Sequence, residues 1–153
     1  MNYLEIQIAT ETTGYPAEQQ FQQWVDAALA KREQDAEIVI RLVDDAESAE
    51  LNQQYRHKSG PTNILSFPFE APEIMELDLL GDLVINAPLI SLEAAQQHKQ
   101  VLHHWAHITV HGVLHLLGYD HIEEQDAEQM EALEIEILKQ FNIANPYLEE
   151  NVP

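Results

Sequence analysis

The sequence has no cysteine and few basic residues, and each shortage excludes certain bonds or modes of binding. Without cysteine the chain can form no disulfide and can offer no thiolate to a metal. Only 7 Lys and Arg stand against 27 Asp and Glu, so the formal net charge is −20 at pH 7. A protein with this charge repels polyphosphate at long range, which excludes nonspecific coating of nucleic acid but not a local basic cleft.

Long apolar runs are also missing. No run approaches the roughly 20 residues that a membrane-spanning helix needs, and the first five residues lack the basic and apolar regions of a signal peptide. We therefore expect a soluble, cytoplasmic protein that is monomeric and makes no contact with membranes. Its 153 residues fit one domain, residues 1–153.

The hydrophobic pattern predicts four strands and five helices. Alternating or β-branched segments predict strands at residues 4–8, 37–43, 63–67 and 83–85. Apolar residues at helical spacing predict helices at residues 17–31, 44–55, 87–97, 100–117 and 123–140. Because the strands come first and the later half is helical, we predict an α+β fold with helices packed on one side of the sheet.

Particular residues mark the ends of several predicted helices. Asp44 and Glu47 have the spacing of a capping box, Pro88 suits a first helical turn, and Gly118 is a natural stop. In the last helix, Met130, Leu133, Ile137 and Leu138 are expected to face inward. Its acidic residues are expected to form the outer face.

Seven of the eight histidines lie between His98 and His121. His111 and His115 are four residues apart, so one helix face directs both imidazoles at the same point. Gly118 allows a sharp turn that brings His121 back towards them. Three neutral imidazoles suit Zn²⁺ and leave a fourth position for water, which is typical of a catalytic site. The spacing therefore predicts one zinc ion per chain, bound by His111, His115 and His121.

Two further histidines have a less definite interpretation. His103 and His107 continue the same stripe towards the start of the helix. We interpret them as side chains that surround the metal or line a cleft, and a role as ordinary core histidines is equally compatible with the pattern.

The histidine spacing matches the zinc-peptidase pattern H-E-x-x-H-x-x-G-x-x-H except at one position. Where those enzymes have a glutamate as general base, this chain has Gly112. The missing carboxylate counts against hydrolysis of peptides. Cleavage of a phosphodiester is less demanding, because a substrate oxygen could take the proton.

Arg56 and Lys58, with His57 between them, form the only dense cationic spot of the chain. A guanidinium offers a planar set of donors that fits a phosphate. The alternative is that Arg56 simply pairs with one of the many acidic residues.

These motifs together resemble the YbeY family of bacterial endoribonucleases. The resemblance is carried by Tyr55-Arg56, by residues 61–68 and 81–85, and by the eleven residues from His111 to His121. It implies a zincin-like fold with a mixed four-stranded sheet and about five or six helices. It also implies His111, His115 and His121 as zinc ligands and Arg56 as a catalytic residue.

By this resemblance the chain would be a single-strand-specific metallo-endoribonuclease. Its expected substrate is ribosomal RNA, near the 3′ end of the small-subunit rRNA, and it would also help to clear defective ribosomes. The expected partners are the small ribosomal subunit, its proteins and an Era-type GTPase.

Two other functions remain open from the sequence. The first is a zinc-dependent hydrolase of a peptide or amide bond, which the zincin-like spacing favours. The second is a non-catalytic ribosome-assembly factor in which zinc only orders the fold. A net charge of −20 is unusual for an enzyme that cuts RNA, and it predicts weak unaided affinity for RNA.

Overall fold

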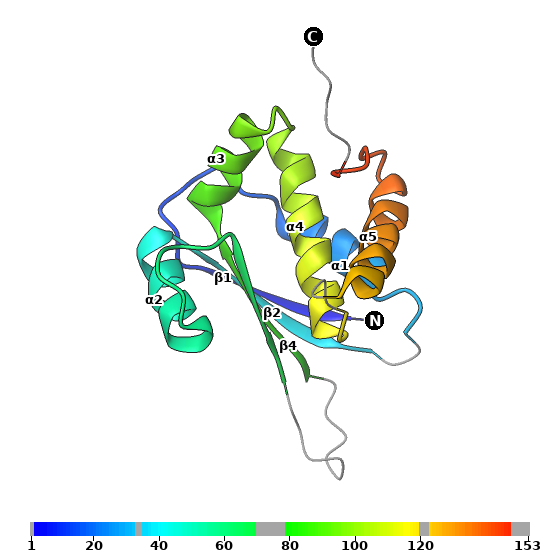
Figure 1. Ribbon diagram of the computed structural model, residues 1–153, viewed down its shortest axis with the longest axis horizontal. Coiled ribbons are helices and arrows are strands. Elements are labelled where there is room, and N and C mark those ends of the chain that lie inside the picture. The colour runs from blue at the N-terminus through cyan, green and yellow to red at the C-terminus, as the bar shows by residue number, and fades with distance from the viewer. Residues whose placement is uncertain (1, 33–34, 70–78, 120–122, 148–153) are drawn as a thin grey trace.

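The computed structural model describes residues 2–32, 35–69, 79–119 and 123–147. Within them lie four strands and five helices (Figure 1). The strands are β1 (Tyr3–Ile8), β2 (Glu37–Val43), β3 (Ile64–Pro68) and β4 (Leu79–Asn86). The helices are α1 (Glu18–Ala28), α2 (Asp45–Arg56), α3 (Ala87–Gln96), α4 (Val101–Leu116) and α5 (Glu124–Lys139).

The four strands form one mixed sheet in the order β1-β2-β4-β3. β1 pairs with β2, and β2 with β4, in parallel, with Ile6 opposite Ile40 and Ile40 opposite Leu83. β3 runs antiparallel to β4 along one edge, with Ser66 opposite Leu83. The α+β fold and the mixed four-stranded sheet are therefore confirmed, and the similarity to zincin peptidases stays a prediction.

The main core lies on one face of the sheet, beneath α1, α4 and α5 (Figure 1). Successive side chains of a strand point to opposite faces, so Ile38, Ile40 and Leu42 of β2 all enter this core. α4 is buried along most of its length and packs on α1, α3, α5 and β3. The helix that carries the histidines is thus the central support of this layer.

The opposite face of the sheet is covered by α2 (Figure 1). Val43, Leu65 and Val84 form a smaller core there, with Leu51 and Phe67 packed against it. Helices therefore cover both faces, whereas the sequence had suggested one. The reason is that Val43, Leu65 and Val84 on this second face are also apolar and buried, and they require a cover of their own.

One local prediction, the capping box of Asp44 and Glu47, was wrong. Asp44 precedes α2 but makes no capping bond within it, because its carboxylate accepts hydrogen bonds from the Thr10 hydroxyl and the Glu11 N–H. Glu47 pairs with Arg41 of β2, Nε to carboxylate, at 2.6 Å. The two acids therefore fasten α2 to β2 and to the segment after β1 instead of capping the helix.

Other local predictions were confirmed. Pro88 lies in the first turn of α3, and the Asn86 side chain caps this helix by accepting from the Leu89 N–H at 3.2 Å. Gly118 follows the end of α4 with φ +100°, a left-handed conformation that glycine adopts without strain. No described helix is both long and apolar enough to cross a bilayer.

Candidate active site

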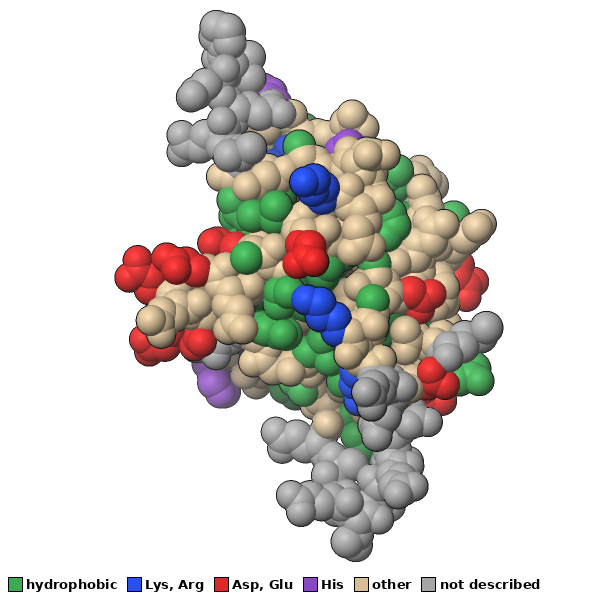
Figure 2. Space-filling view, turned by 90° about the vertical axis from the view of Figure 1, so that its right-hand side faces the viewer, with side chains coloured by type: hydrophobic (Ala, Val, Ile, Leu, Met, Phe, Trp, Pro, Cys, Tyr) green, Lys and Arg blue, Asp and Glu red, His purple; other side chains and the backbone are tan. Residues whose placement is uncertain are grey.

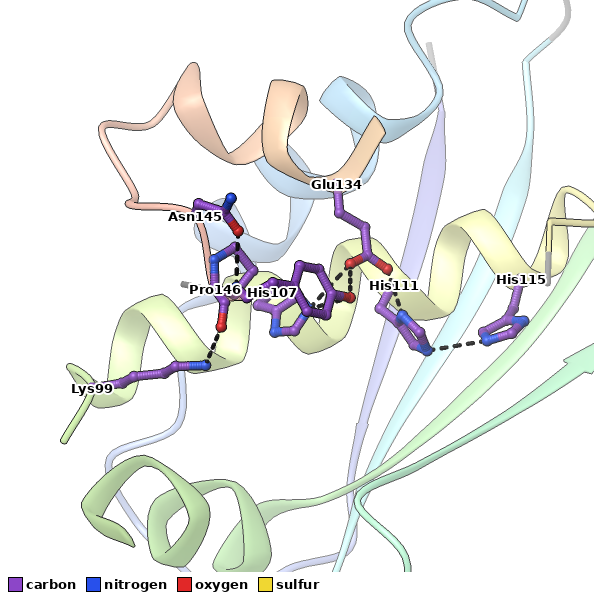
Figure 3. Close-up of polar contacts among 8 residues, drawn as sticks. Lys99, His107, His111, His115, Glu134, Asn145 and Pro146 are labelled. Atoms are coloured by element: carbon purple, nitrogen blue, oxygen red, sulfur yellow. Dashed lines mark hydrogen bonds and ion pairs between the residues drawn. The ribbon is translucent and has the colours of Figure 1, made fainter. Parts of the chain in front are cut away.

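α4 presents His107, His111 and His115 along one side, one turn apart (Figure 3). The Nε2 atoms of His111 and His115 lie 3.0 Å apart. After His115 the helix ends, and the Tyr119 N–H donates back to the Leu114 carbonyl at 3.1 Å. The two predicted ligands of this helix are thus brought together, while His121 lies outside the described residues.

Glu134 of α5 points towards these histidines and its side chain is fully buried (Figure 3). One carboxylate oxygen, Oε1, lies 2.5 Å from His111 Nδ1. The other, Oε2, lies 3.2 Å from His107 Nε2 and accepts the hydroxyl hydrogen bond of Tyr147. Three side chains from two other parts of the chain therefore converge on one buried carboxylate.

Burial and hydrogen bonding shift the pKa values of Glu134, His107 and Tyr147. Burial alone would raise the pKa of Glu134, but the bonds from His107 and His111 outweigh it and lower the pKa to about 2. Burial lowers the pKa of His107, and it raises the pKa of Tyr147 together with the bond to Glu134. Glu134 is thus ionised and His107 neutral near pH 7.

The segment after α5 that carries Tyr147 is fastened to the turn that precedes α4. The Lys99 Nζ donates to the Pro146 carbonyl at 3.0 Å (Figure 3). Within the segment, the Tyr147 N–H donates to the Asn145 side chain at 2.8 Å. These bonds hold the segment beside the start of the helix that carries the histidines.

A second carboxylate–histidine pair lies near the start of α4. His104 Nε2 is 2.9 Å from Glu93 of α3, and the Asn63 amide donates to the same carboxylate at 3.2 Å. Burial opposes ionisation of Glu93, yet the bonds from His104 and Asn63 lower its pKa overall. This pair joins α3, α4 and the start of β3, away from His111 and His115.

A cleft of about 620 Å³ runs along β3, the edge strand of the sheet. We call it the β3 cleft. His111 and His115 border it from α4, and Tyr55 and Arg56 border it from the end of α2. The remaining lining comes from residues 62–68. Two groups of predicted site residues that are far apart in the sequence therefore face one cavity.

The end of α2 is held in place by the loop that follows it. Ser48 Oγ donates to the Thr62 carbonyl at 2.7 Å, and the Asn52 amide donates to the Gly60 carbonyl at 2.9 Å. Both side chains are buried. The Arg56 side chain is exposed, and it makes no hydrogen bond or ion pair with any residue that the structure describes. Its guanidinium is therefore available to a ligand in the β3 cleft.

Aromatic rings border the same cleft beside Arg56. The rings of Tyr55 and Phe67 lie 4.9 Å apart, edge to face. Tyr55 is 62% exposed. The cleft thus combines imidazole nitrogens, a free guanidinium and an exposed aromatic face.

Packing explains why position 112 is glycine. A Cβ at Gly112 would lie 2.5 Å from Cδ1 of Ile64 and 2.9 Å from Cδ2 of Leu83. α4 therefore lies against the sheet at this point, and the glutamate that zinc peptidases carry there has no room. The side of α4 that would place a general base is packed against β3 and β4.

The sequence analysis missed Glu134 and Tyr147. Glu134 was assigned to the acidic outer face of its helix, and this was wrong, because its side chain is buried. The available signal was spacing, since Glu134 lies four residues from both Met130 and Leu138, which face inward. Of the two uncertain histidines, His107 joins the network and His103 makes no polar contact among the described residues.

Two overlapping sets of donors could hold a metal ion. The first pairs the Nε2 atoms of His111 and His115, a nitrogen set that suits Zn²⁺ and similar ions. The second, His107, His111 and Glu134, has ligand atoms within 4.8 Å of one another. Both sets contain His111, so the residues present fit a metal of this class.

Comparison with known proteins agrees with this arrangement. A family model described as endoribonuclease YbeY matches residues 5–142. The fold is also similar to the solution structure of TM1509 from Thermotoga maritima, with a TM-score of 0.59 and 24% sequence identity. That similarity covers 97% of this chain and 99% of the other. The match extends over nearly all of the chain, including the helix with His111 and His115 and the segment with Arg56, and the protein therefore belongs to the YbeY endoribonuclease family.

Proposed function

We propose that this protein is a zinc-dependent, single-strand-specific endoribonuclease that acts on ribosomal RNA. The observation that carries the proposal is the β3 cleft, which is bordered by the imidazoles of His111 and His115 and by the Arg56 guanidinium, for which the described residues offer no partner. Membership of the family supports a nuclease that processes rRNA. The zinc ligands in this proposal are His111, His115 and His121.

When bound, the metal supplies a Lewis acid that polarises a phosphoryl oxygen and activates a water molecule. Arg56 donates to the phosphate oxygens and stabilises the negative charge that builds up as the phosphorus is attacked. Its planar guanidinium can donate to two oxygens of one phosphate at once. Ser48 and Asn52 hold the end of α2, so Arg56 starts from a fixed backbone position.

The aromatic surface of the cleft favours a single strand. An exposed ring binds a nucleobase by stacking, and the face of a base is free for this only when the base is unpaired or flipped out. Tyr55 provides such a ring beside Arg56. A strand whose phosphate contacts Arg56 would place a neighbouring base within reach of Tyr55.

The cellular setting follows from the same proposal. We place the enzyme in the cytoplasm, as one domain and a monomer, with the small ribosomal subunit and its proteins as partners, and an Era-type GTPase among the candidates. Its action would lie near the 3′ end of small-subunit rRNA and in the removal of defective ribosomes. A net charge of −20 supports a need for partners, because free RNA is repelled at long range.

The test is cleavage of matched single-stranded and duplex RNA by the zinc-loaded protein, with the cuts mapped. Arg56→Ala should reduce kcat/KM by about 10²–10³ while zinc content and fold persist, and Arg56→Lys should restore activity only in part. Lys139→Ala, which removes the same charge from the exposed end of α5, is the control. Full activity in Arg56→Ala, or equal cleavage of duplex, would contradict the proposal.

The alternatives predict different results in the same assays. A peptide or amide hydrolase would cut peptides, and the lack of room for a glutamate at Gly112 argues against it. A non-catalytic assembly factor would show no cleavage, and His115→Ala would unfold it. The proposed enzyme instead gives a folded and inactive His115→Ala variant.

A further inference from the structure

We propose that Glu134 is a positioning residue, which fixes the imidazole of His111 so that its Nε2 atom is the one offered to the metal. The inference rests on the proposed function only in taking His111 as a metal ligand. It adds a residue of α5 to a site otherwise built from α4 and the end of α2.

Packing alone does not account for a carboxylate at this position. Glu134 is 0% exposed and lies on the inward face of α5, with Met130, Ile137 and Leu138. A buried carboxylate is costly unless it is paired and hydrogen-bonded. Here all of its partners belong to the histidine side of the molecule: His111, His107 and Tyr147. The contacts with the histidines therefore explain why a charged side chain is buried at this position.

The contacts determine which ring nitrogens carry hydrogen. An ionised carboxylate only accepts hydrogen bonds, and a neutral imidazole has a single N–H. His111 therefore donates from Nδ1 to Glu134 over 2.5 Å, so Nε2 is the ring nitrogen that remains to bind a metal. His107 donates from Nε2, which leaves Nδ1 without hydrogen. His107 Nδ1 is buried and has no hydrogen-bond partner among the described residues.

The same contacts favour an indirect role for Glu134 over direct ligation. His111 and His115 border the β3 cleft, whereas neither His107 nor Glu134 does. The side chains of His107 and Glu134 are 12% and 0% exposed, so a metal held between them would be shielded from substrate. Glu134 therefore acts through His111.

The first test is zinc affinity, measured by competition with a chromophoric chelator. Glu134→Gln keeps the shape and weakens the acceptor, and Glu134→Leu removes the acceptor without leaving an unpaired charge. We expect about 10-fold weaker binding for Gln and up to about 100-fold for Leu, the range seen when such outer partners of ligating histidines are changed. Circular dichroism of the metal-free proteins reports whether each variant is folded.

Glu93→Gln is the matched control. It alters another carboxylate that contacts a histidine of α4, at 2.9 Å, but His104 does not border the cleft. This variant should lose stability and keep the zinc affinity of the wild type. Wild-type affinity in both folded Glu134 variants would overturn the inference. So would loss of zinc in His107→Ala with retention in His115→Ala, because that pattern assigns Glu134 as a direct ligand.

The second test needs no metal. Nitrogen-15 NMR of the metal-free wild type should show His111 with hydrogen on Nδ1, and Glu134→Leu should shift it towards the Nε2–H form. A wild-type His111 that carries its hydrogen on Nε2 would overturn the inference. Neither readout uses RNA, so a protein that binds zinc as expected but cuts no RNA would refute only the proposed function.

Discussion

Tyr55 is an exposed aromatic residue at the edge of the β3 cleft, 4.9 Å from the ring of Phe67. We predict that Tyr55→Ala raises KM for single-stranded RNA about tenfold, with a smaller change in kcat, because stacking of one base contributes roughly 1–3 kcal/mol. Tyr55→Phe should behave as the wild type. Tyr3→Ala is the control, since Tyr3 is 60% exposed on β1, at the other edge of the sheet. Equal KM values for Tyr55→Ala and Tyr3→Ala would refute the prediction.

Glu93 links stability to pH. Its pKa is lowered in the folded protein, so its contribution to stability is present above the unfolded-state pKa near 4.5 and is lost as pH falls through the lower folded value. We predict that Glu93→Gln lowers the free energy of unfolding by about 1–3 kcal/mol at pH 7, because bonds to a charged acceptor become neutral ones. The difference from wild type should shrink below pH 4.5 in urea titrations. A constant difference down to pH 3 would contradict this origin.

At the residue scale, the sequence predicted that His111 and His115 lie together, because of their spacing, and Arg56 stood out as a rare cation. The metal-binding roles of His111, His115 and His121 and the catalytic role of Arg56 stay predictions. Glu134 was missed because one acid among seven in the stretch 123–140 looks like surface charge. Tyr147 was missed because its contact with Glu134 depends on how the segment after α5 folds back, and no local pattern encodes that path.

At the scale of elements, the described strands and helices start and end close to the predicted positions. β4 is the exception, since it begins at Leu79 and not near Leu83. Gly81 lies inside this strand, and its missing side chain makes room for the Phe67 carbonyl and the Leu116 side chain. The strand order was not predictable, because parallel strands are joined through helices and their pairing leaves no local signal.

The absence of a side chain at Gly81 allows β4 to pack closely against β3 and α4. A Cβ there would lie 2.4 Å from the Phe67 carbonyl oxygen and 2.7 Å from Cδ2 of Leu116. We predict that Gly81→Ala lowers the free energy of unfolding by about 3 kcal/mol, because overpacking against backbone cannot be relieved by a rotamer change. Urea denaturation of the wild type and the variant measures this difference in the free energy of unfolding.

Gly60→Ala is the control for Gly81→Ala. Gly60 also has a positive φ, of +89°, but nothing lies within 4 Å of its Cβ position. Gly60→Ala should lower the free energy of unfolding by about 1–2 kcal/mol, from backbone strain alone. Equal losses in the two variants would show that the close contact at Gly81 costs nothing.

At the scale of the molecule, negative charge dominates. Glu124, Glu128 and Glu136 are exposed on α5, and acidic side chains flank the few Lys and Arg side chains on the face drawn in Figure 2. We predict that cleavage of free RNA first accelerates as salt rises from low levels and then slows. Long-range repulsion is screened over about 10 Å at ~0.1 M salt, and higher salt also weakens the contacts of Arg56.

The comparison for the salt prediction is a variant in which Glu124 and Glu128 are changed to Gln. It should be faster than wild type at low salt and equal at high salt. A wild type that slows steadily from the lowest salt, with a variant no faster, would show ordinary counterion release and no repulsive surface.

The contact between His111 and Glu134 joins residues that are synthesised well apart. A ribosome adds about 5–20 residues per second, and N-terminal parts fold first. The sheet is complete in sequence at Asn86 and α4 at Leu116, but Glu134 and Tyr147 are synthesised later. A nascent chain can therefore begin to build its core while His111 still lacks the partner that orients it. The ring is fixed only when the residues from Glu134 to Tyr147 have left the exit tunnel and packed against α4.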